Sequence, residues 1–140
     1  MSREMSEKMS REISEEMDAL RDSIETAVTL KLYRTTKDAA NAHLFKSRAA
    51  RFPLAKAWNL GNFKSARLSP VPFPPGDRPR GSKDLASVRF HRSQIRKSGD
   101  VTTPIWIAMT RKGPVLLDGA HRLIAAYLEH KRSVPAFIVG

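Results

Sequence analysis

Four residues near the C-terminus have side chains and spacing suited to holding a phosphate group: Asp118, Gly119, His121 and Arg122. They follow an apolar run at 115–117 that predicts a short buried strand, and they begin an amphipathic helix. Asp118 is a good N-cap, and Gly119 allows a tight turn. His121 and Arg122 fall in the first helical turn, where free N–H groups and the helix dipole favour an anion. The same spacing is typical of an ordinary strand-to-helix turn with a hydrogen-bonded His and a solvated Arg.

A phosphate at this turn would accept hydrogen bonds from the helix start and a two-pronged contact from Arg122. His121 could donate to it, or act as a general acid or base near neutral pH. Asp118 has two interpretations, an N-cap or a ligand for a phosphate-bound Mg²⁺. His121 and Asp118 are therefore the candidate catalytic residues. Glu129 lies too far along the helix to share a metal with Asp118, which argues against a two-metal nuclease. The other histidines lack metal-ligand spacing and are expected at the surface or in the packing: His43, His91 and His130.

The elements around the turn predict a compact unit over residues 85–140. In chain order we expect a short strand at 88–91, a strand at 104–109, a basic turn at 111–113, a strand to 117, a helix to about 130 and a last strand at 134–139. Pro135 places the start of the last strand at a sheet edge or outside the ladder.

Several of these features, in this order, resemble the ParB N-terminal and sulfiredoxin superfamily over about 40% of the chain. They are Pro104-Ile105, Arg111-Lys112-Gly113, Leu117-Asp118-Gly119-Ala120-His121-Arg122, Ala125-Ala126 and Val134-Pro135-Ala136-Phe137-Ile138-Val139. The resemblance implies a small mixed sheet and a nucleotide, ATP or CTP, bound at the turn with Mg²⁺. It also implies that Thr103 lies near that ligand.

Two departures from the family pattern fall on Ala120. Sulfiredoxin-like proteins have a catalytic Cys there, whereas this chain has no cysteine, so sulfinic-acid reduction is excluded. ParB proteins have an acidic residue there. The chain also ends at Gly140, without the helix-turn-helix that follows in ParB proteins. It therefore looks most like small plasmid or phage members of the superfamily, which include fertility-inhibition factors.

Charge is distributed unevenly along the chain, whose net charge is +11. Residues 1–30 carry a net −4 and residues 31–140 a net +15. That excess favours a polyanionic partner, DNA first. A basic helix is predicted at 35–52, capped by Thr35 or Thr36 and ended by Pro53. The expected DNA contacts are Lys46, Arg48 and Arg51 on this helix, and Arg111 and Lys112 in the basic turn.

An amphipathic helix is predicted at residues 1–32, where apolar residues recur in steps of three and four. It starts with the four-residue repeat MSRE, MSEK, MSRE, ISEE. Each repeat rotates by about 40° on the helix, which suits a long coiled coil poorly. Two interpretations are open: a helix docked on its own domain, or one that binds a protein partner or a second copy to form a homodimer.

The predicted organisation is an α+β protein in three segments: the helix at 1–34, a basic helix and Pro-rich connector at 35–84, and the ParB-like domain at 85–140. The Pro-rich stretch is either a connector or a binding flap. No apolar run reaches the length of a membrane span, and a cytoplasmic location is expected. The first functional hypothesis is a nucleotide-binding protein that contacts DNA, with weak ATPase or nuclease activity. The alternative is a non-catalytic inhibitor of conjugation or partition machinery with a vestigial nucleotide site.

Overall fold

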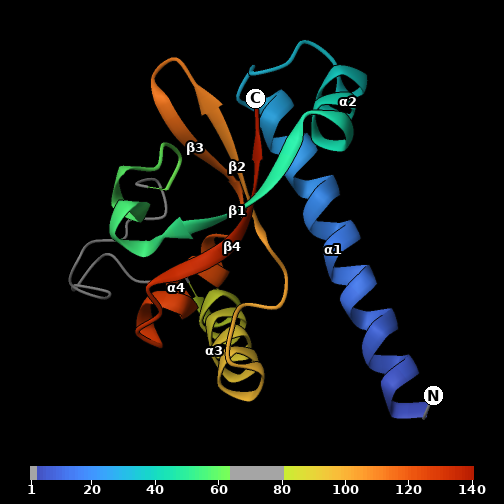
Figure 1. The fold of residues 1–140 in the computed structure, drawn as a ribbon, viewed down its shortest axis with the longest axis vertical. Helices are drawn as coiled ribbons and strands as arrows, with labels where there is room; N and C mark the ends of the chain where they lie inside the picture. The colour runs from blue at the N-terminus through green and yellow to red at the C-terminus, as the bar shows by residue number, and fades with distance from the viewer. Residues whose placement is uncertain (1–2, 64–80) are drawn as a thin grey trace.

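Figure 1 shows the computed structural model, which describes residues 3–63 and 81–140. The fold is α+β, as the sequence predicts, because helices pack on both faces of one mixed four-stranded sheet. The elements in chain order are α1 (Arg3–Thr29), α2 (Thr36–Phe45), β1 (Ser47–Pro53), the 3-10 helix η1 (Leu54–Asn59), α3 (Gly81–Ser98), β2 (Ile105–Thr110), β3 (Gly113–Asp118), α4 (Ala120–Leu128) and β4 (Ser133–Val139).

The strand order is β1-β4-β2-β3, so β4 lies inside the sheet. It pairs antiparallel with β1 and parallel with β2. Two alternatives were predicted for the start of this strand, a sheet edge or a position outside the ladder. The sheet edge is wrong, because β4 is an inner strand and Pro135 lies opposite Arg51 of β1, but Pro135 does lie outside the ladder with β2. Pairing with β2 begins at Ala136, one residue after the proline. The sheet thus accommodates a residue that lacks an N–H at the point where the second ladder starts.

One face of the sheet packs against α3, α4 and η1. Its strands contribute alternate residues such as Ile105, Ile107 and Ile138, and α4 contributes Leu123 and Ile124. The alternation arises because successive side chains of a strand point to opposite faces. This face forms the larger of the two buried clusters and places the start of α4 against β2.

The opposite face packs against α1 and α2 (Figure 1). Trp106 and Val139 meet small residues here, including Ala19 and Ala27 of α1. Small side chains let the helix approach the sheet closely. The predicted N-terminal helix is therefore confirmed, and it contacts the domain from about Glu15 onward.

The second predicted helix is only partly confirmed. Thr35 caps α2 by accepting a hydrogen bond from the N–H of Asp38, but the helix ends at Phe45 rather than continuing to Pro53. The rest of the predicted segment forms β1, where Ala50 and Phe52 face the larger cluster. Strand pairing with β4 outweighs the helix propensity of the alanines, which is a weak preference.

The strand predicted at 88–91 is wrong, because these residues lie within α3. Val88 and Ile95 are both buried in the larger cluster, seven residues apart and so on one face of the helix. The stretch Val88-Arg89-Phe90-His91 has only two apolar residues in four positions, which is too short a pattern to separate a strand from a helical segment by periodicity. The helix packs on α4, and this contact decides its conformation.

The Pro-rich connector falls largely within residues 64–80 and therefore outside the described residues; its last residues, from Gly81, belong to α3. Two of the three predicted segments share one sheet, since β1 comes from the second and the other strands from the third, and α1 of the first segment packs on that sheet. Within residues 3–63 and 81–140, no helix has the length and apolarity needed to cross a membrane.

Candidate functional site

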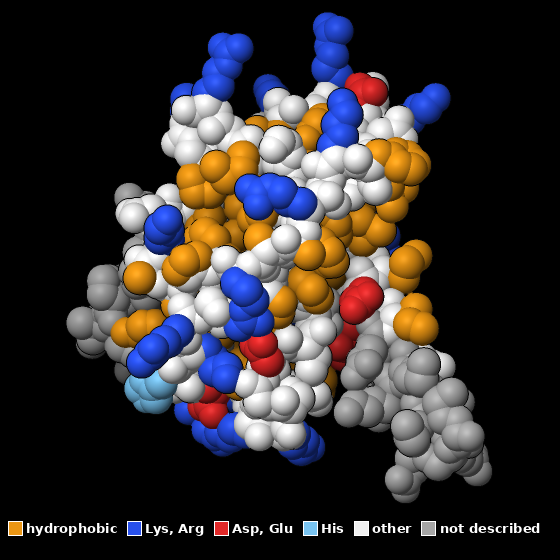
Figure 2. All heavy atoms as spheres, in the orientation of Figure 1, with side chains coloured by type: hydrophobic (Ala, Val, Ile, Leu, Met, Phe, Trp, Pro, Cys, Tyr) orange, Lys and Arg blue, Asp and Glu red, His pale blue; other side chains and the backbone are white. Residues whose placement is uncertain are grey.

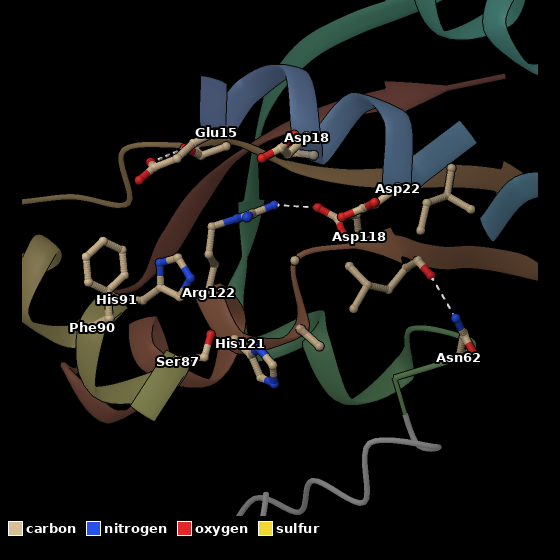
Figure 3. Close-up of a pocket in the computed structure, with 16 residues that line it drawn as sticks. Glu15, Asp18, Asp22, Asn62, Ser87, Phe90, His91, Asp118, His121 and Arg122 are labelled. Carbon is tan, nitrogen blue, oxygen red and sulfur yellow. Dashed lines mark hydrogen bonds and ion pairs between the residues drawn. The ribbon is translucent and has the colours of Figure 1, made fainter. Parts of the chain in front are cut away.

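A cavity of about 530 Å³ opens where β3 leads into α4. Its walls come from α1, from α3 and from the turn between β3 and α4 (Figure 3). All five residues predicted to hold a phosphate line it: Thr103, Asp118, Gly119, His121 and Arg122. The tertiary structure therefore brings the candidate site together in one place.

Gly119 forms the N-cap of α4 with φ of 115°. A Cβ at this position would lie 2.5 Å from Cγ2 of Ile105, so both the dihedral angle and the contact require glycine. The interpretation of Asp118 as the N-cap is wrong, because no side chain caps this helix. Asp118 is the last residue of β3, and its carboxylate turns to a different partner.

That partner is Arg122, whose Nη2 donates to Oδ2 of Asp118 at 2.8 Å. The two side chains are 12% and 21% exposed, so this ion pair is largely removed from water. The same Nη2 lies 3.4 Å from the carbonyl oxygen of Pro104. Burial raises the pKa of Asp118, while the Arg122 guanidinium opposes that shift.

The Nε atom of Arg122 is buried and has no hydrogen-bond partner among the described residues. A buried donor without a partner is costly and calls for an acceptor such as water or a ligand. The N–H of Nε is therefore a donor that a bound anion could accept from, although Nη2 is held by Asp118.

Three carboxylates of α1 form the wall opposite α3: Glu15, Asp18 and Asp22 (Figure 3). Glu15 accepts a hydrogen bond from the hydroxyl of Thr103 at 3.3 Å. None of these three carboxylates is among the residues that the sequence predicted for the site. Their spacing of three and four residues, which places them on one helix face, is the signal that could have revealed them.

Two histidines also line the cavity, His121 from α4 and His91 from α3 (Figure 3). Burial, followed by the charges of Arg122 and His121, lowers the pKa of His91 to about 4. His91 is therefore neutral near pH 7 and can accept or donate a hydrogen bond. The sequence predicted only a surface or packing role for it.

The lining has more negative than positive charge, which affects what it can bind. A free phosphate would compete with Asp118 for Arg122 and would meet the α1 carboxylates. A phosphate that brings its own cation avoids much of this repulsion. In the part of the chain that the structure describes, no cluster of three or more His, Asp or Glu side chains is arranged to hold a metal ion.

Four of the five predicted DNA contacts lie at the other end of β3. The starts of β1 and β3 and the ends of β2 and β4 meet at one end of the sheet, because Ser47 pairs with Val139 and Thr110 pairs with Gly113. This brings together Lys46, Arg48, Arg111 and Lys112. The helical placement predicted for Arg48 and Arg51 is wrong, since both lie on β1.

Arg51 does not join this group. It lies further along β1, where its Nη1 donates to Asp100 at 2.6 Å and its Nη2 to the carbonyl oxygen of Ser133. Glu129, which the sequence places too far from Asp118 to share a metal, accepts from Arg92 and Arg96 instead. These pairs join elements of the fold and leave both residues outside the two candidate sites.

Comparison with known proteins assigns this chain to no family. No protein-family model matches the chain, and searches of curated proteins and of solved structures also find no match. The resemblance to the ParB and sulfiredoxin superfamily therefore rests on the residues quoted for it.

Proposed function

We propose that this protein binds the phosphate backbone of a nucleic acid through the end of the sheet that carries its exposed cations. We call this region the basic end and define it by six residues: Lys31, Arg34, Lys46, Arg48, Arg111 and Lys112. All six are exposed, and none pairs with a carboxylate among the described residues. This convergence of unpaired cations from three separate chain segments is the observation that carries the proposal.

The basic end combines the α1–α2 loop, the start of β1 and the β2–β3 turn. Leu30 and Leu32, which flank Lys31, line a groove together with Arg111 and Lys112. Figure 2 shows Lys and Arg side chains projecting from this end of the molecule. Strands β1 and β3 are three strand spacings apart, about 14 Å, so the cations can reach several phosphates at once.

Contacts of this kind neutralise phosphates and carry no base information. We therefore expect sequence-independent binding whose affinity falls steeply with salt, because each contact releases counterions. Fluorescence anisotropy with a labelled DNA duplex over a series of salt concentrations measures the slope of log affinity against log salt.

The test compares Arg111→Ala/Lys112→Ala with the wild type. Loss of two phosphate contacts should reduce the magnitude of the salt slope by about 2. Lys97→Ala removes an exposed charge from the last turn of α3 and should leave the slope unchanged. An equal effect of the two variants would show that net charge alone, rather than the basic end, determines binding.

A second candidate function is binding of a nucleotide, ATP or CTP with Mg²⁺, in the cavity. The unpartnered Nε of Arg122 favours it, since that donor points to an acceptor. Gly119 would let the phosphate approach the N–H groups at the start of α4, and His121 would donate to it. If the bound nucleotide is hydrolysed, His121 and Asp118 are the residues predicted to catalyse the reaction.

Thermal shift with each nucleotide, with and without Mg²⁺, tests this function. We expect stabilisation only when Mg²⁺ is present, because of the carboxylates on α1. Arg122→Lys keeps a positive charge beside Asp118 but removes Nε, and it should abolish the shift. A nucleotide shift that survives in Arg122→Lys would exclude this site.

A further inference from the structure

An apolar groove of about 270 Å³ lies between α1, α2 and the sheet, beside the buried Ala19 of α1. Its lining includes Leu20, Leu44, Trp106 and Phe137. Ile13 and Met17 of α1 stand at its rim with 60% and 61% of their surface exposed. Figure 2 shows hydrophobic side chains gathered over this part of the molecule. Large side chains left in water at such a groove indicate a surface that binds another protein.

The first turns of α1 stand away from the sheet and from the other helices (Figure 1). In the sequence, the apolar series extends into these first turns. Met5, Met9 and Ile13 follow one another at intervals of four residues. A short helical segment is only marginally stable in water unless its apolar face is covered, since most helical stability comes from such packing.

We propose that the occupant of this groove is the N-terminal half of α1 from a second copy of this chain. The two helices cross antiparallel about a two-fold axis near Ile13. In this register Met9 of each copy lies opposite Met17 of the other, and Met5 comes opposite residues 20–21. Methionine suits such a position because its flexible side chain fills irregular apolar space. A two-fold arrangement lets each copy fill the other's groove.

Charge along the helix supports the antiparallel direction. The residues that directly precede members of the apolar series lie along one edge of the apolar stripe. They include Lys8, Glu12 and Glu16. When two helices cross antiparallel, this edge meets the same edge of the other copy. The register that pairs Ile13 with Ile13 places Lys8 opposite Glu16, twice by symmetry. Glu12 comes opposite its own copy at the axis, a repulsion that the two Lys8–Glu16 pairs offset.

Sedimentation velocity over a range of protein concentrations tests the association of the full chain. We expect a dimer for the wild type and at least a tenfold rise in its dissociation constant for Met17→Glu. Met109→Glu is the matched control, because it puts the same charge on an exposed methionine of β2, away from the groove. A wild type that remains monomeric at all concentrations overturns the proposal, as does an equal loss in both variants.

A charge exchange tests the direction of the crossing. Lys8→Glu and Glu16→Lys should each weaken the dimer, and the double variant should restore it toward the wild type. Circular dichroism of each variant confirms that its helices are retained. Absence of recovery in the folded double variant overturns the antiparallel register.

Discussion

Strand β3 joins two charged regions that differ in how their charges are balanced. At its start, the basic end exposes cations that pair with no described carboxylate, and at its end the cavity holds Arg122 in a largely buried pair with Asp118. The two regions are about 17 Å apart along the strand. Arginine side chains occur in both regions, but they are exposed at the basic end and largely buried in an ion pair in the cavity.

Burial accounts for the difference. A buried cation without a partner is strongly unfavourable, so Asp118 is needed wherever Arg122 is present. An exposed cation is solvated by water and contributes little to stability on its own. Charges at the basic end are consequently available to a partner, whereas those in the cavity are largely committed to each other.

The largest effect on stability should come from breaking the buried pair. Asp118→Ala leaves Arg122 without its counter-ion and should lower the free energy of unfolding by about 3 kcal/mol. Urea denaturation measures this change. Replacing both partners with apolar residues, Asp118→Leu with Arg122→Met, should recover most of the loss. No recovery would mean that the two side chains stabilise the fold independently.

A smaller effect is expected at the turn beside the pair. Gly119→Ala should cost about 2 kcal/mol or more, because the new Cβ clashes with Ile105 in addition to straining the backbone. Gly99 also has a positive φ, but a Cβ there meets no atom within 4 Å. Gly99→Ala should therefore cost only the backbone strain, about 1 kcal/mol. Equal losses in thermal or urea denaturation would contradict the predicted clash.

The cavity should also respond to acid. His91 has a pKa of about 4 in the folded protein against an ordinary value of 6.5, so the unfolded chain binds more protons between these values. Stability should therefore fall as the pH drops from 6.5 toward 4. His91→Gln removes this contribution, and its melting temperature should fall less over that range than the wild type's.

Exposed His130 provides the control for that measurement, and His130→Gln should follow the wild type. Part of the fall should persist in every variant, because burial also lowers the pKa of His43. Parallel pH profiles for the wild type and His91→Gln would show that His91 titrates normally in the folded protein.

The smallest effect on stability is expected at the basic end. Arg111→Ala/Lys112→Ala should change the free energy of unfolding by no more than about 0.5 kcal/mol, since neither side chain is buried or paired with a described carboxylate. A loss comparable to that of Asp118→Ala would remove the distinction between the two regions.

The comparison also shows which sequence signals were sufficient. The strands around the hairpin, the Gly119 turn and the helix after it were predicted close to their observed bounds, because each has a strong local pattern and turn residues at both ends. Local pattern failed at β1 and at residues 88–91 in the middle of α3. The alanines at β1 favour helix, and the alternating stretch at 88–91 is too short to separate strand from helix, so contacts with β4 and α4 decide.

The sequence by itself determined the charge asymmetry, the N-terminal helix and the set of side chains at the turn, because composition and periodicity are local properties. Only the tertiary structure decided how those side chains are used. It brought Glu15, Asp18 and Asp22 to the turn from a helix about a hundred residues away, and it joined Lys46 and Arg48 to the β2–β3 turn. It also paired Asp118 with Arg122, since a carboxylate and a guanidinium buried together form an ion pair instead of a cap and a free phosphate ligand.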